Sequence, residues 1–160
     1  MIERCVGCGA EFEKIDGPIH RYMTSSAGCW ERYGELLGVM AIAPELKIAR
    51  QLSTDAYAAQ HPGTPTPQAT QSVAVHLLNL YGYLVRGRPV GVPQFAGHKG
   101  AFPRLEPPSF EQTRTVADMP ITGSHEEIAV AARAWAESVW AAWSERHGLI
   151  AEWHAKYSAK

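Results

Sequence analysis

The sequence feature that most constrains this chain is a pair of cysteines close to its start, in the pentapeptide CVGCG. Cys5 and Cys8 are close enough for both thiolates to point at one metal ion, and Gly9 permits a tight turn behind them. A third thiol, Cys29, lies where we expect the N-terminus of a helix, whose dipole favours a thiolate. The three cysteines predict a zinc site. His20 is the favoured fourth ligand, and a later histidine or a water molecule stays an alternative.

Other roles for the cysteines fit the sequence less well. A redox dithiol is expected in a strand-to-helix turn of a β-α-β unit, and the sequence shows no such unit. A disulfide framework is disfavoured because there are only three cysteines. Three buried, inert thiols are the other alternative. All three cysteines lie in the part of the chain with the least regular structure, and zinc would give that part a reason to fold.

The apolar periodicity of the rest of the chain predicts a mostly α fold, a bundle of about four main helices with the zinc knuckle at one end. Pro44 is suited to start the second helix, and Ser124 with Glu127 has the spacing of a capping box before the last one. The tryptophans of the last helix are expected mainly in the core, or else in a pocket or dimer seam. We expect a single domain over 1–160, divided into a zinc-knuckle segment 1–29, helices 1 to 3 within 30–87, a proline-rich irregular segment 88–123 and a C-terminal helix 124–160.

The charge balance narrows the classes of partner. Fifteen basic and sixteen acidic residues give a net charge of −1, so no basic surface for nucleic acid is expected. No apolar run approaches the roughly 18 residues of a membrane span, and the first residues lack the apolar stretch of a secretory signal. We therefore expect a cytoplasmic protein that binds neither nucleic acid nor membrane. The sequence is compatible with a small-molecule ligand and with a homo-oligomer.

Two polar residues fall on the apolar faces of their helices. Asp55 lies in register with Leu52 and Ala59, and His76 lies in register with Val73 and Leu80. The loop between the two helices is short, so the helices should be antiparallel and the two side chains nearly level. A buried carboxylate needs a partner or a metal ion. The pair is either a hydrogen-bonded link between two helices or part of a functional site.

Other side chains are candidates for the same site. His147 on the last helix could join Asp55 and His76 as a catalytic group. Tyr57, His61 and Gln71 are candidates for contact with a substrate. His61 precedes a proline that ends its helix, so we expect it to be exposed. His98, His125 and His154 are expected to be surface or loop residues.

The leading functional hypothesis is a metal-dependent enzyme that acts on a small molecule. Asp55 and His76, with His147 as a third candidate, would move protons or hold a second, catalytic metal, and residues 88–123 would cover the pocket as a lid. The first alternative is a non-catalytic binding module that zinc stabilises. A weaker alternative makes Cys29 a nucleophile with His20 as its base.

Five stretches together resemble a bacterial family known as domain of unknown function 5946. They are CVGCG, GPIHRYMTSSAGCW, DAYAAQHPG, QSVAVHLLNLYG and WAAWSERHGLIAEW, which are spread over residues 5–153. The resemblance implies that a set of positions belongs together, namely Cys5, Cys8, His20, Cys29, Asp55, His61, His76 and Trp143. Arg146 departs from the family pattern, which places two histidines at 146 and 147. The family name implies no activity.

Overall fold

The computed structural model describes residues 1–88, 95, 97–98 and 100–158, and 57% of them lie in helices. The prediction of a mostly α fold is therefore confirmed. The described part contains five α-helices, three short 3₁₀ turns and a two-stranded sheet. The α-helices are α1 (Ala27–Ala41), α2 (Lys47–Gln60), α3 (Pro67–Leu84), α4 (His125–Ala142) and α5 (His147–Tyr157).

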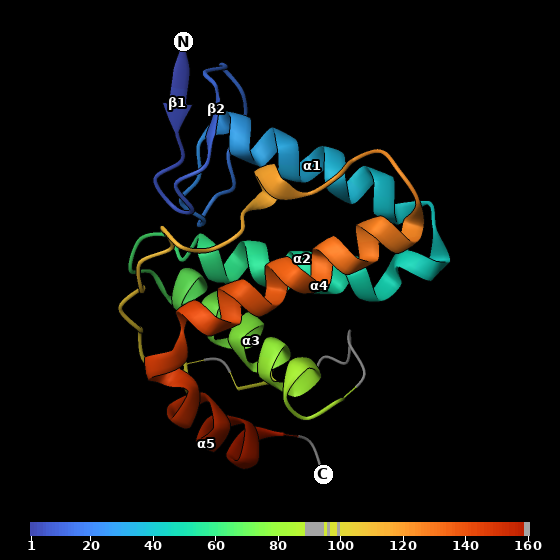
Figure 1. Ribbon diagram of the computed structural model, residues 1–160. Coiled ribbons are helices and arrows are strands. Elements are labelled where there is room, and N and C mark those ends of the chain that lie inside the picture. Colours follow the sequence, from blue (N-terminus) through green and yellow to red (C-terminus); the bar gives the residue numbers. More distant parts are fainter. Residues whose placement is uncertain (89–94, 96, 99, 159–160) are drawn as a thin grey trace.

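The knuckle is a short antiparallel hairpin at one end of the molecule (Figure 1). Strand β1 (Ile2–Arg4) pairs with β2 (Glu11–Glu13), with Glu3 opposite Phe12. Gly9 adopts a left-handed conformation, with φ of 81°, and its N–H donates to the Cys5 carbonyl. This is the conformation that glycine adopts without strain, so the Cys-x-x-Cys-Gly turn closes as its sequence predicts.

The helix starts follow local sequence signals. Ser26 caps α1, because its hydroxyl accepts the N–H of Cys29. Thr66 caps α3 in the same way, with Pro67 in the first turn. Pro44 starts a 3₁₀ turn, η1 (Pro44–Leu46), that leads directly into α2. Ser124 and Glu127 form the predicted capping box of α4.

The C-terminal helix predicted for 124–160 is two helices. Helix α4 ends at Ala142, and a 3₁₀ turn, η3 (Ser144–Arg146), leads into α5 in a new direction. Trp143 at this break is buried, and its indole N–H donates to the Ala59 carbonyl. The break lets α5 pack against α3, which a straight continuation of α4 could not do. Hydrophobic periodicity did not reveal the break because both helices bury apolar faces.

Helix α2 lies at the centre of the molecule, against α1, α3 and α4 (Figure 1). The core contains Leu36 of α1, Leu52 of α2, Leu77 of α3 and Trp135 of α4. Trp140, Trp143 and Trp153 are buried as well, so the four tryptophans of the C-terminal part lie in the core. Because α2 is covered on several sides, a polar side chain on one of its buried faces must find a partner inside the protein.

Between α3 and α4 the described residues contain one 3₁₀ turn, η2 (Val116–Asp118), and otherwise follow an irregular path. Residues 89–94, 96 and 99 of the predicted lid lie outside the described part of the chain. None of the helices that the structure describes combines the length and the apolar character that crossing a bilayer requires.

Candidate metal centre and adjoining pocket

Four buried side chains from three separate places in the sequence meet beneath the knuckle. Cys5 and Cys8 come from the hairpin turn, Cys29 from the first turn of α1, and His61 from the residue that ends α2. Their ligand atoms all lie within 4.8 Å of one another. The Sγ atoms of Cys8 and Cys29 are 3.8 Å apart, and His61 Nε2 is 3.5 Å from the Sγ atoms of both Cys5 and Cys29. The group can hold a metal ion.

Close backbone packing brings the knuckle to the end of α2. A Cβ atom at Gly7 would overlap the His61 ring and the Thr24 carbonyl oxygen, so only glycine fits between them. The end of α2 is held in turn by α4, because the indole N–H of Trp135 donates to the Gln60 side chain at 2.9 Å. Trp143 bonds the preceding carbonyl, that of Ala59. The position of His61 is therefore fixed from both sides.

The ring of His61 is oriented for ligation. Its Nδ1 lies 2.6 Å from the Tyr57 carbonyl oxygen, and a carbonyl can only accept, so Nδ1 carries the proton. In the neutral ring Nε2 then presents a lone pair to the thiols. A hydrogen bond from the far nitrogen to a backbone carbonyl is a common support of metal-bound histidines. Tyr57 also stacks on the ring, with centroids 3.9 Å apart, and its hydroxyl lies 3.5 Å from Cys29 Sγ.

The pKa values of the three thiols are shifted in different directions by their neighbours. Hydrogen bonds from Cys29 and Cys8 hold the pKa of Cys5 well below its usual range. The bond with Cys29 lowers the pKa of Cys8, but the neighbouring Cys5 and burial outweigh it and raise that pKa to about 12. The bonds to Cys5 and Cys8, with burial, raise the pKa of Cys29 well above its ordinary value. One negative charge is thus tolerated, and three thiolates together require a cation among them.

The fourth member of this group is His61 and not His20, which the sequence had favoured. His20 Nδ1 accepts the backbone N–H of Tyr22, and its ring packs edge-on against Tyr22 and Trp30. Burial lowers the pKa of His20. His61, expected to be exposed, is 1% exposed because the knuckle covers the end of α2. The number of residues between Cys29 and His61 matches no characteristic spacing of metal ligands. The sequence therefore could not pair the two residues, and only the fold brings them together.

A second polar pair lies between α2 and α3. Asp55 and His76 are in contact, with Asp55 Oδ1 2.7 Å from His76 Nδ1. The Asp55 side chain is 1% exposed, and its Oδ1 also accepts the amide N–H groups of Gln51 and Asn79. Since a carboxylate oxygen accepts, His76 Nδ1 donates, and Nε2 is the ring nitrogen left for other contacts. The sequence predicted this pair, because both side chains fall on the apolar faces of their helices and at nearly the same level along them.

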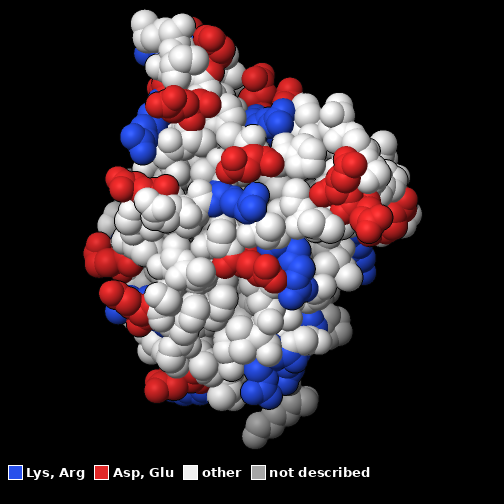
Figure 2. Space-filling model, viewed as in Figure 1, with Lys and Arg blue, Asp and Glu red and all other residues white. Residues whose placement is uncertain are grey.

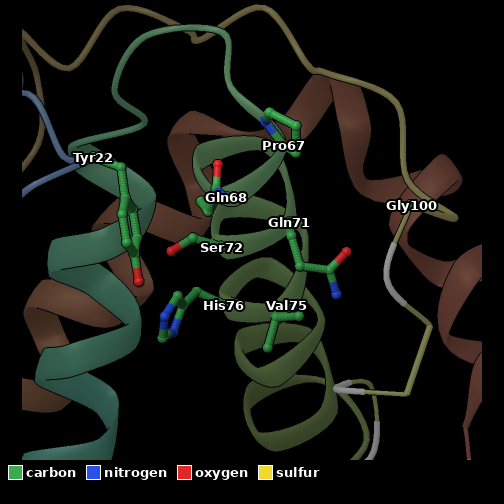
Figure 3. A pocket seen from close by; sticks show the side chains of 8 residues that line it. All are labelled: Tyr22, Pro67, Gln68, Gln71, Ser72, Val75, His76 and Gly100. Atoms are coloured by element: carbon green, nitrogen blue, oxygen red, sulfur yellow. The ribbon is translucent and has the colours of Figure 1, made fainter.

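His76 lines a pocket of about 470 Å³ that lies along a half-buried face of α3. Gln68, Gln71, Ser72, Val75 and His76 recur at helical spacing along this face, as Figure 3 shows.

Tyr22 bounds the pocket on one side and Gly100 on the other (Figure 3). A Cβ atom at Gly63 would overlap the Tyr22 carbonyl, so the turn before α3 holds the backbone of Tyr22 in place. Gly63 is in the left-handed region, with φ of 69°, which also requires glycine.

The other candidate side chains are placed as follows. Gln71 lines the pocket, whereas Tyr57 is fully buried beside the cysteines. His147 stacks on Trp140, with centroids 3.8 Å apart, and its Nε2 lies 2.7 Å from the Trp140 carbonyl oxygen. It is not among the residues that line the pocket with His76, so Asp55 and His76 form a pair without it.

In the described ranges, the cysteine and histidine group is the one place where three or more metal-binding side chains converge. Asp55 and His76 offer two ligands and are bonded to each other.

The chain belongs to a family of unknown function, DUF5946, whose model matches residues 3–144. The match includes all four members of the candidate metal centre and the Asp55–His76 pair. His147 lies beyond the matched range. Searches of curated proteins and of solved structures match nothing.

Proposed function

We propose that the metal of the cysteine and histidine group is zinc. In a tetrahedral zinc site, bonds of ~2.3 Å to sulfur and ~2.0–2.1 Å to nitrogen place two sulfurs about 3.8 Å apart and a sulfur and a nitrogen about 3.5 Å apart. The separation of Cys8 and Cys29 is 3.8 Å, and those of His61 from Cys5 and Cys29 are 3.5 Å. This agreement supports a Cys₃His zinc site. Thiolate and imidazole are also the ligands that zinc favours over magnesium or calcium.

The zinc has a structural role. All four ligand positions are filled by buried protein side chains, whereas catalytic zinc keeps one position open for water or substrate. Because Cys29 is fully buried and faces His61 and not His20, a nucleophilic Cys29 would have neither substrate access nor its expected base. The geometry therefore supports a structural zinc ion that links the knuckle to α1 and α2.

The activity that the geometry supports best is proton transfer on a small molecule, with His76 as general base and Asp55 as the group that orients it. The observation that carries this proposal is the 2.7 Å contact between the two side chains at the wall of a pocket of about 470 Å³. That volume is within the range of small-molecule sites, ~300–1,000 Å³. Asp55 holds the proton on Nδ1, so the neutral ring offers Nε2 as the base.

The pocket indicates the kind of substrate. Among the described residues that line it, His76 is the one ionisable imidazole, beside the phenol of Tyr22 and the uncharged side chains of Gln68, Gln71 and Ser72. The described residues of this lining include no carboxylate, lysine or arginine. We infer a small polar molecule that is held by amide and hydroxyl groups. His76 would remove a proton from it or from a bound water molecule. Because Asp55 Oδ1 and His76 Nδ1 bond each other, we do not assign them a second metal.

A non-catalytic binding module is the second candidate. The observation that favours it is the satisfaction of Asp55 by three donors, from Gln51, His76 and Asn79, which also suits a structural link between α2 and α3. The two candidates differ in whether His76 performs chemistry on a molecule that the pocket binds.

The experiment is a search for turnover with a mixture of small polar metabolites, followed by mass spectrometry, with the zinc-loaded protein. His76→Gln should remove turnover while a metabolite still binds. The matched control is His125→Gln, which removes an exposed histidine on α4. If a metabolite binds but is unchanged by the wild-type protein, the module is supported instead. Equal turnover by His76→Gln and wild type would contradict the enzyme proposal.

A further inference from the structure

A second pocket, of about 280 Å³, lies between the C-terminal ends of α3 and α5. The two helices pack together and run in the same direction, so both end on the same side of the molecule (Figure 1). Tyr81, Arg86 and Arg88 line the pocket from the α3 side, and His154 and Ser158 line it from α5. None of these residues belongs to the Asp55–His76 pocket.

Small residues create the space. Ala151 and Ala155 line the pocket on the same face of α5 as His154 and Ser158. On the facing helix, a Cβ atom at Gly82 would lie 3.2 Å from His154 Nε2, so the glycine lets the imidazole approach α3 closely. His154 is 5% exposed, although the sequence suggested a surface position. Among the described residues its hydrogen-bond partner is the Ser158 hydroxyl, 3.1 Å from Nδ1.

The pocket has a positive character. Arg86 and Arg88 follow the last turn of α3, where Gly87 has a φ of 63° and turns the chain back. The backbone N–H of Arg86 donates to Tyr81 and that of Arg88 to Gly82, so both residues are anchored at the helix end. No Asp or Glu is among the described residues that line the pocket, and neither arginine makes an ion pair with a described residue. Burial, and then the charges of Arg88 and Arg86, lower the pKa of His154.

Acidic and basic side chains both occur on the rest of the surface seen in Figure 2. Figure 2 shows acidic and basic side chains interspersed over most of the visible surface, with basic side chains gathered near the foot, where Figure 1 places the ends of α3 and α5. The helix ends explain part of this arrangement. Each helix C-terminus carries roughly half a negative charge, so two ends balance about one arginine. The second arginine leaves an excess of positive charge beside a buried imidazole and two hydroxyl groups.

We propose that this pocket binds a phosphate group, either free or carried by a small molecule. Arg86 and Arg88 supply positive charge and N–H donors from the α3 side, where Tyr81 adds a hydroxyl group, and Ser158 supplies a second hydroxyl group from the end of α5. Donors that face the pocket from two helix ends suit a tetrahedral anion better than a planar carboxylate. The site is independent of the Asp55–His76 pair, so it stands whether or not that pair is catalytic.

The test is a titration of the ¹⁵N-labelled, zinc-loaded protein with inorganic phosphate, followed by NMR at constant ionic strength. We expect saturable shifts centred on Gly82, His154 and Ser158. Arg88→Gln should weaken binding at least tenfold, because a charge-assisted hydrogen bond exceeds the ~1.4 kcal/mol that corresponds to a factor of ten. Ala155→Leu should weaken binding as well, since its side chain would occupy the pocket. Parallel titrations with acetate and with glycerol phosphate distinguish a general anion site, free phosphate and a phosphorylated molecule.

The matched control is Arg50→Gln, which removes the same charge from an exposed position on α2. It should bind phosphate as the wild type does. Shifts that grow linearly without saturation would overturn the proposal. The same conclusion would follow if Arg88→Gln and Ala155→Leu, folded by circular dichroism, bound phosphate as well as Arg50→Gln does. In those cases the arginines would only balance the two helix ends.

Discussion

Replacing His76 by alanine tests whether the Asp55–His76 pair is built for chemistry or for stability. The change removes one of three hydrogen bonds to Asp55 Oδ1 and leaves the bonds from Gln51 at 3.1 Å and Asn79 at 3.2 Å. It also opens the wall of the pocket that His76 lines. In His76→Ala the Asp55 carboxylate therefore keeps two hydrogen-bond donors and becomes accessible to water.

The magnitude follows from these contacts. A hydrogen bond to a charged group contributes about 1.5–3 kcal/mol, and loss of a partner from a fully buried pair costs about 3–5 kcal/mol. The His76 side chain is 19% exposed, so a water molecule can replace part of the lost bond. We expect the free energy of unfolding to fall by about 1–2 kcal/mol. Turnover of any substrate of this pocket should be lost.

Urea unfolding of the zinc-loaded protein measures this free energy, because its midpoint moves in proportion to stability when the slope is unchanged. Asp55→Asn and the double variant complete a double-mutant cycle that isolates the coupling between the two side chains. Leu80→Ala is a useful reference, since it removes a buried side chain from the same helix and should cost about 2–5 kcal/mol.

Two results would refute this reasoning. A loss of more than ~3 kcal/mol in His76→Ala would show that the pair behaves as a sealed structural link. If His76→Ala changed neither the free energy of unfolding nor ligand binding, the pair would contribute to neither stability nor function.

The remaining predictions concern the metal centre and one buried histidine. Elemental analysis should find one zinc per chain. Cys5→Ser should lose the zinc and have a free energy of unfolding lower by several kcal/mol, because structural zinc contributes folding free energy directly. Zinc-free protein of unchanged stability would argue for inert thiols. His61→Ala should lose the metal whereas His20→Ala should keep it, which a zinc assay of the two purified variants decides; the reverse pattern would exclude the ligand set seen here. His154 has a lowered pKa in the folded protein, so its contribution to stability is present while the ring is neutral and is lost as the pH falls below about 6.5. Urea midpoints measured as the pH falls below that value should therefore decline less steeply in His154→Gln than in wild type, and parallel curves would contradict this assignment.

Local signals in the sequence were sufficient for most of the helical architecture. A capping residue such as Ser124 acts within one helical turn, so its effect can be predicted without the fold. The break at Trp143 could not be read in this way. It depends on the bond from its indole to Ala59 and on the packing of α5 against α3, which are contacts between distant parts of the chain.

The two candidate sites differ in the same respect. Asp55 and His76 face one another because each lies on the apolar stripe of a helix and a short loop makes the two helices antiparallel. Periodicity and loop length therefore led to the pair. The pocket beside it depends on Tyr22, which is distant in sequence and is held by the turn at Gly63. No sequence period connects Tyr22 to α3.

By itself, the sequence determined the helical class, the three thiols and the inward Asp55–His76 pair, because each depends on spacing within one segment or across one short loop. Only the tertiary structure decided the fourth member of the metal centre. His61 reaches Cys29 because the knuckle closes over the end of α2, with Gly7 leaving room for the imidazole ring. A ligand delivered by packing between distant elements has no characteristic spacing, and so the choice between His20 and His61 could not be made from the order of residues.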